Sequence, residues 1–154
     1  MRSQWRLDKA MTYESTKQVD SSECAGVRFT VYRMSFGRRL ELTRRVRELL
    51  GKLEFVRAGQ GGSAEDAEAA LLAGEIDREY TRWGLASLEG LEIDGQPATP
   101  EDLIEKGPEG LVGEVLAAIR REAGLDGEER KNSASHSTSS EETKPGGNAT
   151  NAGA

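Results

Sequence analysis

Residues 42–56, LTRRVRELLGKLEFV, decide the fold of this chain because their apolar positions repeat at helical spacing. The repeated positions, at intervals of 4, 3, 4 and 3 residues, are Leu42, Val46, Leu49, Leu53 and Val56. These intervals place the five side chains along one face of an α-helix. The pattern therefore predicts an amphipathic helix that begins near residue 35 and ends near Gly59.

A second amphipathic helix is expected directly after the turn Gln60-Gly61-Gly62. Ser63 stands three residues before Asp66, an arrangement typical of a capping box at a helix start. The apolar face then repeats at intervals of 3, 4, 4 and 3 residues through Ala69, Leu72, Ile76, Tyr80 and Trp83. Gly84 is the expected end of this helix. Because the connecting loop is short, the two helices are predicted to form an antiparallel hairpin.

The remaining segments predict a mainly α domain with little extended structure. Residues 27–33 alternate apolar and polar side chains and predict a short N-terminal strand. Residues 85–93 read as a short extended segment that enters the Asp94-Gly95 turn. Two C-terminal helices are expected, from Thr99 to about residue 106 and from about residue 109 to 122. The predicted fold is thus a small helical domain: the hairpin, two further helices, one short strand and one extended piece.

Composition divides the 154 residues into three parts. Residues 1–26 are polar and aperiodic and are expected to be a flexible leader, and residues 27–125 a single helical domain. Residues 126–154 are expected to be a disordered tail rich in Ser, Thr, Gly and Asn, since apolar side chains are too few there to offset the entropy of ordering. The one cysteine, Cys24, and the one histidine, His136, fall in the two outer parts, which argues against a disulfide or a structural zinc site.

Charge is distributed unevenly along the chain. Residues 1–58 carry 13 Lys and Arg against 7 Asp and Glu, and residues 59–130 carry 6 against 18. One explanation is that the arginines of the first predicted helix face the acids of the second across the hairpin. The other is that the basic helix, residues 38–52, binds a nucleic acid. The first is preferred, because Glu41 and Glu48 interrupt the basic run, and nucleic-acid binding is disfavoured.

The acidic stretch LEIDGQPATPEDL, residues 91–103, raises the question of a catalytic or metal site. Its carboxylates do not match the spacing of a known calcium loop. Turn and capping chemistry explains them instead: Asp94 with Gly95 forms a turn, and Thr99 caps a helix whose first position is Pro100. The segment is therefore expected to join the hairpin to the C-terminal helices, and no enzymatic activity, metal or cofactor is expected.

Five residues are candidates for contact with a partner protein: Phe55, Tyr80, Trp83, Arg44 and Arg45. Large aromatic side chains dominate the energetics of protein interfaces. Tyr80 and Trp83 continue the apolar stripe of the second helix, however, so a role in the core is the preferred interpretation of both. Phe55 lies off the stripe of the first helix and is the better candidate for an exposed contact.

The order of motifs resembles the tail assembly chaperones encoded in the tail-morphogenesis clusters of tailed phages and prophages. The motifs that carry this resemblance are RMSFGRRLELTRRVREL (33–49), EIDREYTRWGL (75–85), LEIDGQPATPEDLIEKGPEGL (91–111) and LDGEERKNS (125–133). The resemblance implies a cytoplasmic protein that binds the long, hydrophobic tape-measure protein and keeps it soluble, together with other tail assembly proteins as partners. It also implies that a programmed frameshift could fall near Lys131-Asn132.

Two other functions and the state of association are left open by the sequence. The same helices could build a structural virion or head–tail connector component, or a small nucleic-acid-binding regulator that uses residues 38–52. Self-association into a homo-oligomer is also compatible with the pattern. A membrane-bound protein is not expected, because no apolar run approaches the length of a membrane span.

Overall fold

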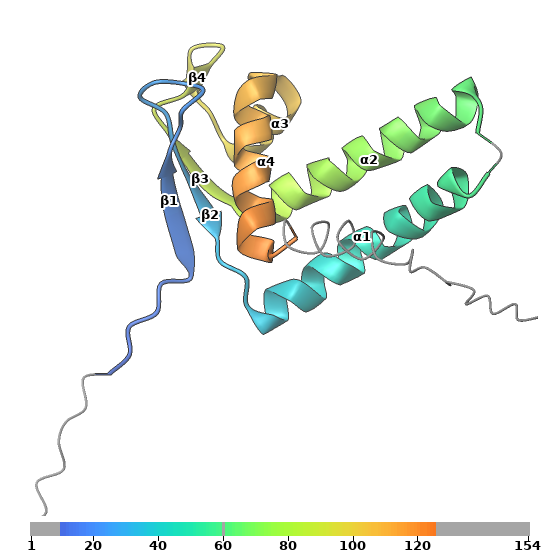
Figure 1. Ribbon diagram of the computed structural model, residues 1–154. Coiled ribbons are helices and arrows are strands. Elements are labelled where there is room, and N and C mark those ends of the chain that lie inside the picture. The colour runs from blue at the N-terminus through green and yellow to red at the C-terminus, as the bar shows by residue number, and fades with distance from the viewer. Residues whose placement is uncertain (1–9, 60, 126–154) are drawn as a thin grey trace, which may run out of the picture.

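The computed structural model of this protein describes residues 10–59 and 61–125. It is mostly helical with a small β component (Figure 1). The elements in chain order are β1 (Thr16–Asp20), β2 (Arg28–Tyr32), α1 (Phe36–Arg57), α2 (Ser63–Gly84), β3 (Leu85–Glu89), β4 (Glu92–Ile93), β5 (Gln96–Pro97), α3 (Pro100–Lys106) and α4 (Glu109–Ala123). No helix among the described residues is long and apolar enough to cross a membrane.

A three-stranded antiparallel sheet in the order β1-β2-β3 forms one layer of the fold. The central strand β2 places Phe29 opposite Val19 of β1 and Leu88 of β3, with a register shift between Thr30 and Val31 on the β3 side. Side chains alternate between the two faces of a strand, so Phe29 and Val31 point to the same face, and both are fully buried. The helical hairpin α1–α2 is the connection between the paired strands β2 and β3.

Helix α4 covers the inner face of the sheet and also packs against α2. Its residues Leu111, Val115 and Ile119 recur at helical spacing and are at most 1% exposed. Leu103 of α3 is fully buried as well. The core therefore lies where the sheet, the base of the hairpin and α4 meet, and it continues between α1 and α2 as far as Leu53 and Leu72. Figure 1 shows the arrangement of these elements.

The hairpin predicted from the apolar repeat is present, and α1 packs along α2 (Figure 1). The Ser35 side chain caps α1 by accepting a hydrogen bond from the backbone N–H of Arg38. The start of α2 differs from the prediction. Gly62 is its N-cap and Ser63 is already helical, so Ser63 forms no capping box. The helix ends at Gly84, as predicted, and Gly84 is buried against α4.

The prediction of a flexible leader over residues 1–26 is wrong for residues 16–20, which form strand β1. This strand pairs along its length with β2, and Val19 packs against the core. The Lys17 ammonium group lies 2.9 Å from a carboxylate oxygen of Glu122 in α4. Strand β1 contains only one apolar residue, and its pairing with β2 is what makes it a strand. The pattern of apolar residues within β1 alone does not indicate this pairing. The expected disordered tail, with His136 and Lys131-Asn132, lies outside the described residues.

The segment 91–103 is a turn and a helix start, as predicted. Asp94 and Gly95 both have positive φ, 53° and 77°, and join β4 to β5 as a two-residue hairpin turn of the kind that favours Asp-Gly. Thr99 caps α3: its hydroxyl accepts from the N–H of Asp102, whose carboxylate accepts from the N–H of Thr99 at 3.0 Å. The hydrogen bonds from Thr99 lower the pKa of Asp102. Three of the four carboxylates of this segment, those of Asp94, Glu101 and Asp102, thus have structural partners, and that of Glu92 is exposed.

Candidate interaction surface

The helical hairpin extends from the body formed by the sheet, α3 and α4 (Figure 1). Of the 22 residues of α1, only Leu42, Val46 and Leu53 are buried, and they line the side that faces α2. Helix α1 is therefore exposed over most of its circumference. A long helix that is covered on one side only presents a large surface for contact with other molecules.

Several large apolar side chains of this hairpin point into solvent. On α1, Phe36 is 80% and Phe55 is 82% exposed, and on α2 Leu71 is 63% exposed. The complete set, called here the exposed apolar residues of the hairpin, is Phe36, Leu40, Leu50, Phe55 and Leu71. Where exposed apolar side chains form a continuous patch, they mark contacts with proteins or membranes, or ligand-binding grooves.

A hollow of about 200 Å³ lies between α1 and the end of α4. Its apolar lining includes Leu42, Val46 and Leu50 of α1, and it is completed by Tyr80, Ala123 and Leu125. Arg39 and Arg47 also line it. This α1–α4 hollow is thus apolar inside and bordered by positive charge.

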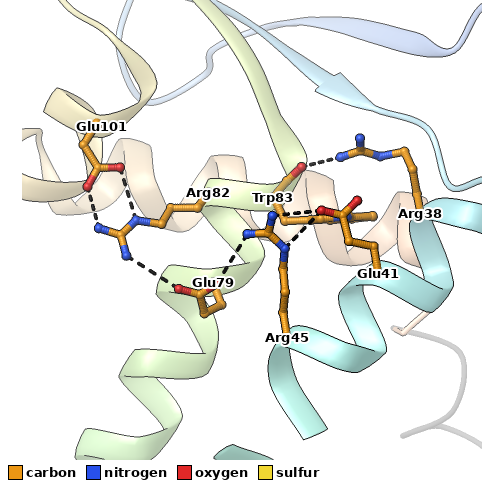
Figure 2. A network of polar contacts seen from close by, with 7 residues as sticks. All are labelled: Arg38, Glu41, Arg45, Glu79, Arg82, Trp83 and Glu101. Carbon is orange, nitrogen blue, oxygen red and sulfur yellow. Dashed lines mark hydrogen bonds and ion pairs between the residues drawn. The ribbon is translucent and has the colours of Figure 1, made fainter.

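Arg38 fixes the base of the hairpin to the sheet. Its guanidinium carbon lies 3.9 Å from the centre of the Tyr32 ring and 4.3 Å from that of Trp83, distances at which a cation is attracted to an aromatic face. The guanidinium group also donates a hydrogen bond to the backbone carbonyl of Trp83, one of the last carbonyls of α2 (Figure 2). A cation near the C-terminal end of a helix is favoured by the helix dipole. Arg38 therefore joins β2, α1 and α2.

A chain of alternating charges connects α1 to α3 through α2, as Figure 2 shows. Arg45 of α1 lies 2.8 Å from Glu41 and 3.7 Å from Glu79 of α2. Arg82 lies 3.5 Å from Glu79 and binds Glu101 of α3 through two guanidinium nitrogens. The hydrogen bond between Arg82 and Glu101 raises the pKa of the arginine and lowers the pKa of the carboxyl. The network orients the hairpin relative to α3.

The expected ion-pair seam between the two helices of the hairpin is largely wrong. Among the described residues, Arg45–Glu79 is the one ion pair that joins α1 to α2. The pairs that join α2 to other elements otherwise lead to the C-terminal helices: Arg78 to Glu105, Arg82 to Glu101 and Asp77 to Arg120. The physical reason is that α2 presents both signs of charge, and its polar sides meet α3 and α4 rather than α1.

The structure does not bring the five candidate partner residues together. Phe55 lies in the last turns of α1, next to a hollow shared with Glu65 and Glu68 of α2. Tyr80 and Trp83 are only 9% and 5% exposed and belong to the core. Arg44 is exposed, and Arg45 is part of the charge network. Phe55, Arg44 and Arg45 are thus the exposed members of this set, and of these Arg45 is held in ion pairs.

Arg38 and Glu114 organise the structure, although no local pattern in the sequence distinguishes them from other charged residues. The carboxylate of Glu114 in α4 accepts hydrogen bonds from the Ser21 hydroxyl at 2.5 Å and from the Ser22 N–H and hydroxyl, both at 2.7 Å. Desolvation by itself would raise the pKa of Glu114, but these hydrogen bonds outweigh it and lower the pKa to about 2. Glu114 therefore holds the β1–β2 loop against α4.

Replacing Glu114 by glutamine is expected to destabilise the protein at neutral pH by about 1–3 kcal/mol, because hydrogen bonds to a charged acceptor are lost. The ionised carboxylate is favoured in the folded state, so its contribution is present above the ordinary pKa of about 4.5. This contribution disappears as the pH falls towards 2. Urea unfolding at pH 7 and near pH 2 measures the difference between the variant and the original protein.

Glu92→Gln is the control, since Glu92 is exposed in β4 and forms no ion pair with any other described residue. Its effect on the free energy of unfolding should be small at both pH values. A constant difference between Glu114→Gln and the original protein across this pH range would contradict the proposed role of the ionised group.

No group of His, Cys, Asp and Glu side chains suited to hold a metal ion occurs within residues 10–59 and 61–125. No family model, curated protein or solved structure matches this chain. The surface that distinguishes the described part of the molecule is the hairpin with its exposed apolar residues.

Proposed function

We propose that this protein is a non-enzymatic tail assembly chaperone of a tailed phage or prophage. It binds the tape-measure protein in the host cytoplasm and keeps this client soluble while the tail is built, together with other tail assembly proteins. The observation that carries the proposal is the exposure of Phe36, Leu40, Leu50, Phe55 and Leu71 on a helical hairpin that extends from the body of the fold. The sequence resemblance described above names the client.

The physical basis of this activity is the masking of apolar client segments. A long tape-measure protein contains apolar helical stretches that aggregate until the tail tube covers them. Helices with exposed apolar side chains can pack against such stretches as one helix packs against another. The surrounding charges, with a net charge of −6 for the whole chain, keep the complex in solution.

The experiment is co-expression of this chain with the tape-measure protein encoded beside it. We expect a larger soluble fraction of the client and co-purification of the two proteins. Absence of both effects would contradict the proposal. Mass spectrometry of purified phage particles tests the alternative, because a structural virion or connector protein is retained in the particles, whereas a chaperone is missing from them.

A substitution on the exposed surface tests which residues bind the client. Phe55→Ser is expected to reduce the amount of client that co-purifies, because it removes one of the two most exposed phenylalanines without disturbing the core. Lys52→Ser is the matched control on the same helix, since it removes only an exposed ion pair with Glu48. Circular dichroism confirms that both variants are folded. Equal client recovery by Phe55→Ser, Lys52→Ser and the original protein would exclude Phe55 from the binding surface.

A further inference from the structure

Charged residues of the hairpin remain without ion-pair partners in the part of the chain that the structure describes. On α1 these are five arginines and one acid, Arg38, Arg39, Arg44, Arg47, Arg57 and Glu54, and on α2 they are Glu65, Asp66, Glu68 and Glu75. One molecule thus presents a basic surface on one helix and an acidic surface on the other. A surface of this kind is complementary to a second copy of itself.

The α1–α4 hollow gives the basic surface a defined shape. Its apolar floor includes Leu42 and Leu50, and Arg39 and Arg47 line it along α1. These arginines are eight residues apart, which corresponds to about 12 Å along a helix. The hollow therefore accepts an apolar side chain that has a negative charge on either side.

Helix α2 carries a ridge with the matching pattern. Leu71 is 63% exposed, with Glu68 three residues before it and Glu75 four residues after it. Residues at these spacings lie on the same face of a helix, and the two carboxylates are about 10 Å apart along the axis. Glu68, Leu71 and Glu75, called here the Leu71 ridge, thus present one apolar group between two acids at nearly the spacing of the two arginines.

The Leu71 ridge cannot reach the hollow of its own molecule. Helix α1 packs against the side of α2 that carries the buried residues Leu72 and Ile76, and near the end of the hairpin Glu68 lines a hollow with Phe55 of α1. Leu71 points away from that side and into solvent. The two complementary surfaces can therefore meet only between molecules.

We propose that a second copy of this chain binds through these surfaces. Leu71 of one copy enters the α1–α4 hollow of the other, where Glu68 and Glu75 pair with Arg39 and Arg47. The contact is small and charged, so it is reversible, and it weakens as salt screens the ion pairs. This inference goes beyond the proposed function, because association between copies requires no client.

Sedimentation velocity of the full chain tests the proposal. We expect the average mass to rise over about a hundredfold increase in protein concentration near physiological salt, where the Debye length is about 8 Å. The same series at about 1 M salt, with a Debye length of about 3 Å, should remain monomeric. A constant monomer mass at every concentration in the lower salt would overturn the proposal.

Two charge-reversal variants identify the surfaces. Arg39→Glu with Arg47→Glu, and separately Glu68→Arg with Glu75→Arg, should each weaken self-association at least about tenfold, because like charges then face each other. An equimolar mixture of the two variants should associate again, since each supplies the surface that its partner needs. Glu92→Arg, a reversal on the remote strand β4, should associate like the original protein.

The remaining outcomes are equally decisive. Unchanged association of either double variant, or a mixture that stays monomeric, would overturn the assignment of the surfaces, provided that circular dichroism shows both variants folded. Co-purification with the tape-measure protein is measured separately. Failure of client binding with self-association intact therefore contradicts the proposed function alone, and the reverse result contradicts this inference alone.

Discussion

Replacing Phe29 by alanine is expected to lower the free energy of unfolding by about 3–5 kcal/mol. Phe29 is fully buried in the central strand β2, between Val19 and Leu88 of the neighbouring strands and beneath α4. Truncation removes most of a large apolar side chain and leaves a cavity that neighbours in three elements cannot fill. A domain of this size is typically stable by about 5–15 kcal/mol, so the loss is a large part of the total. Urea unfolding followed by circular dichroism measures it.

Phe55→Ala provides a matched control with the same chemical change. The Phe55 side chain is 82% exposed on α1, so its truncation should alter the free energy of unfolding by less than about 0.5 kcal/mol. Similar unfolding midpoints for the two variants would contradict the described core. Because Phe55→Ala should remain folded, the same variant can also be used to measure client binding.

Local patterns predict the helices and their ends well. The stripe of apolar residues in 42–56 is enough to predict α1, and the three buried residues of this helix, Leu42, Val46 and Leu53, all belong to it. Two other local signals also fix helix ends. Thr99 caps the start of α3, and Gly124 ends α4 in the left-handed conformation with φ 73°. Such signals depend on neighbours within about one helical turn, so they can be recognised in the sequence.

The sheet could be predicted only in part, because strands depend on partners that are distant in sequence. Strand β2 alternates apolar and polar residues and is predicted at nearly its observed position. Strand β1 contains a single apolar residue, Val19, and only its pairing with β2 makes it a strand. The pairing of β2 with β3 also follows from the hairpin that connects them rather than from either strand alone.

The candidate interaction surface on the hairpin could also be predicted only in part from the sequence. The position of Phe55 off the apolar stripe indicates its exposure directly. The role of Arg38 could not be predicted, because its aromatic neighbours Tyr32 and Trp83 come from β2 and the end of α2. The charge distribution suggested pairing within the hairpin, but a sequence does not tell which polar side of α2 faces another helix.

Replacing Gly84 by alanine is expected to destabilise the protein by about 1–3 kcal/mol, although alanine is the better helix former. A Cβ atom at Gly84 would lie 2.5–2.7 Å from three side-chain atoms of Ile119 in α4. Ile119 is 1% exposed and branched at Cβ, so it cannot turn aside within the packed core. The steric conflict therefore outweighs the gain in helix propensity.

Gly74→Ala in the same helix should have the opposite sign. Gly74 is exposed, and a Cβ atom there would meet no other atom within 4 Å. The substitution should stabilise the protein by about 0.5–1 kcal/mol, because alanine loses less backbone entropy than glycine when the helix forms. In thermal and urea unfolding, the midpoint of Gly84→Ala should fall below that of the original protein, and the midpoint of Gly74→Ala should rise above it.

A double-mutant cycle with Ile119→Ala shows whether the contact between α2 and α4 causes the loss. Ile119→Ala alone creates a cavity and should cost about 2–5 kcal/mol. In the double variant the three atoms that obstruct the new Cβ are absent, so Gly84→Ala should no longer destabilise. The coupling free energy should then be favourable by about 1 kcal/mol or more. Simple additivity of the two substitutions would mean that Gly84 is needed for its backbone and not for the close approach of the helices.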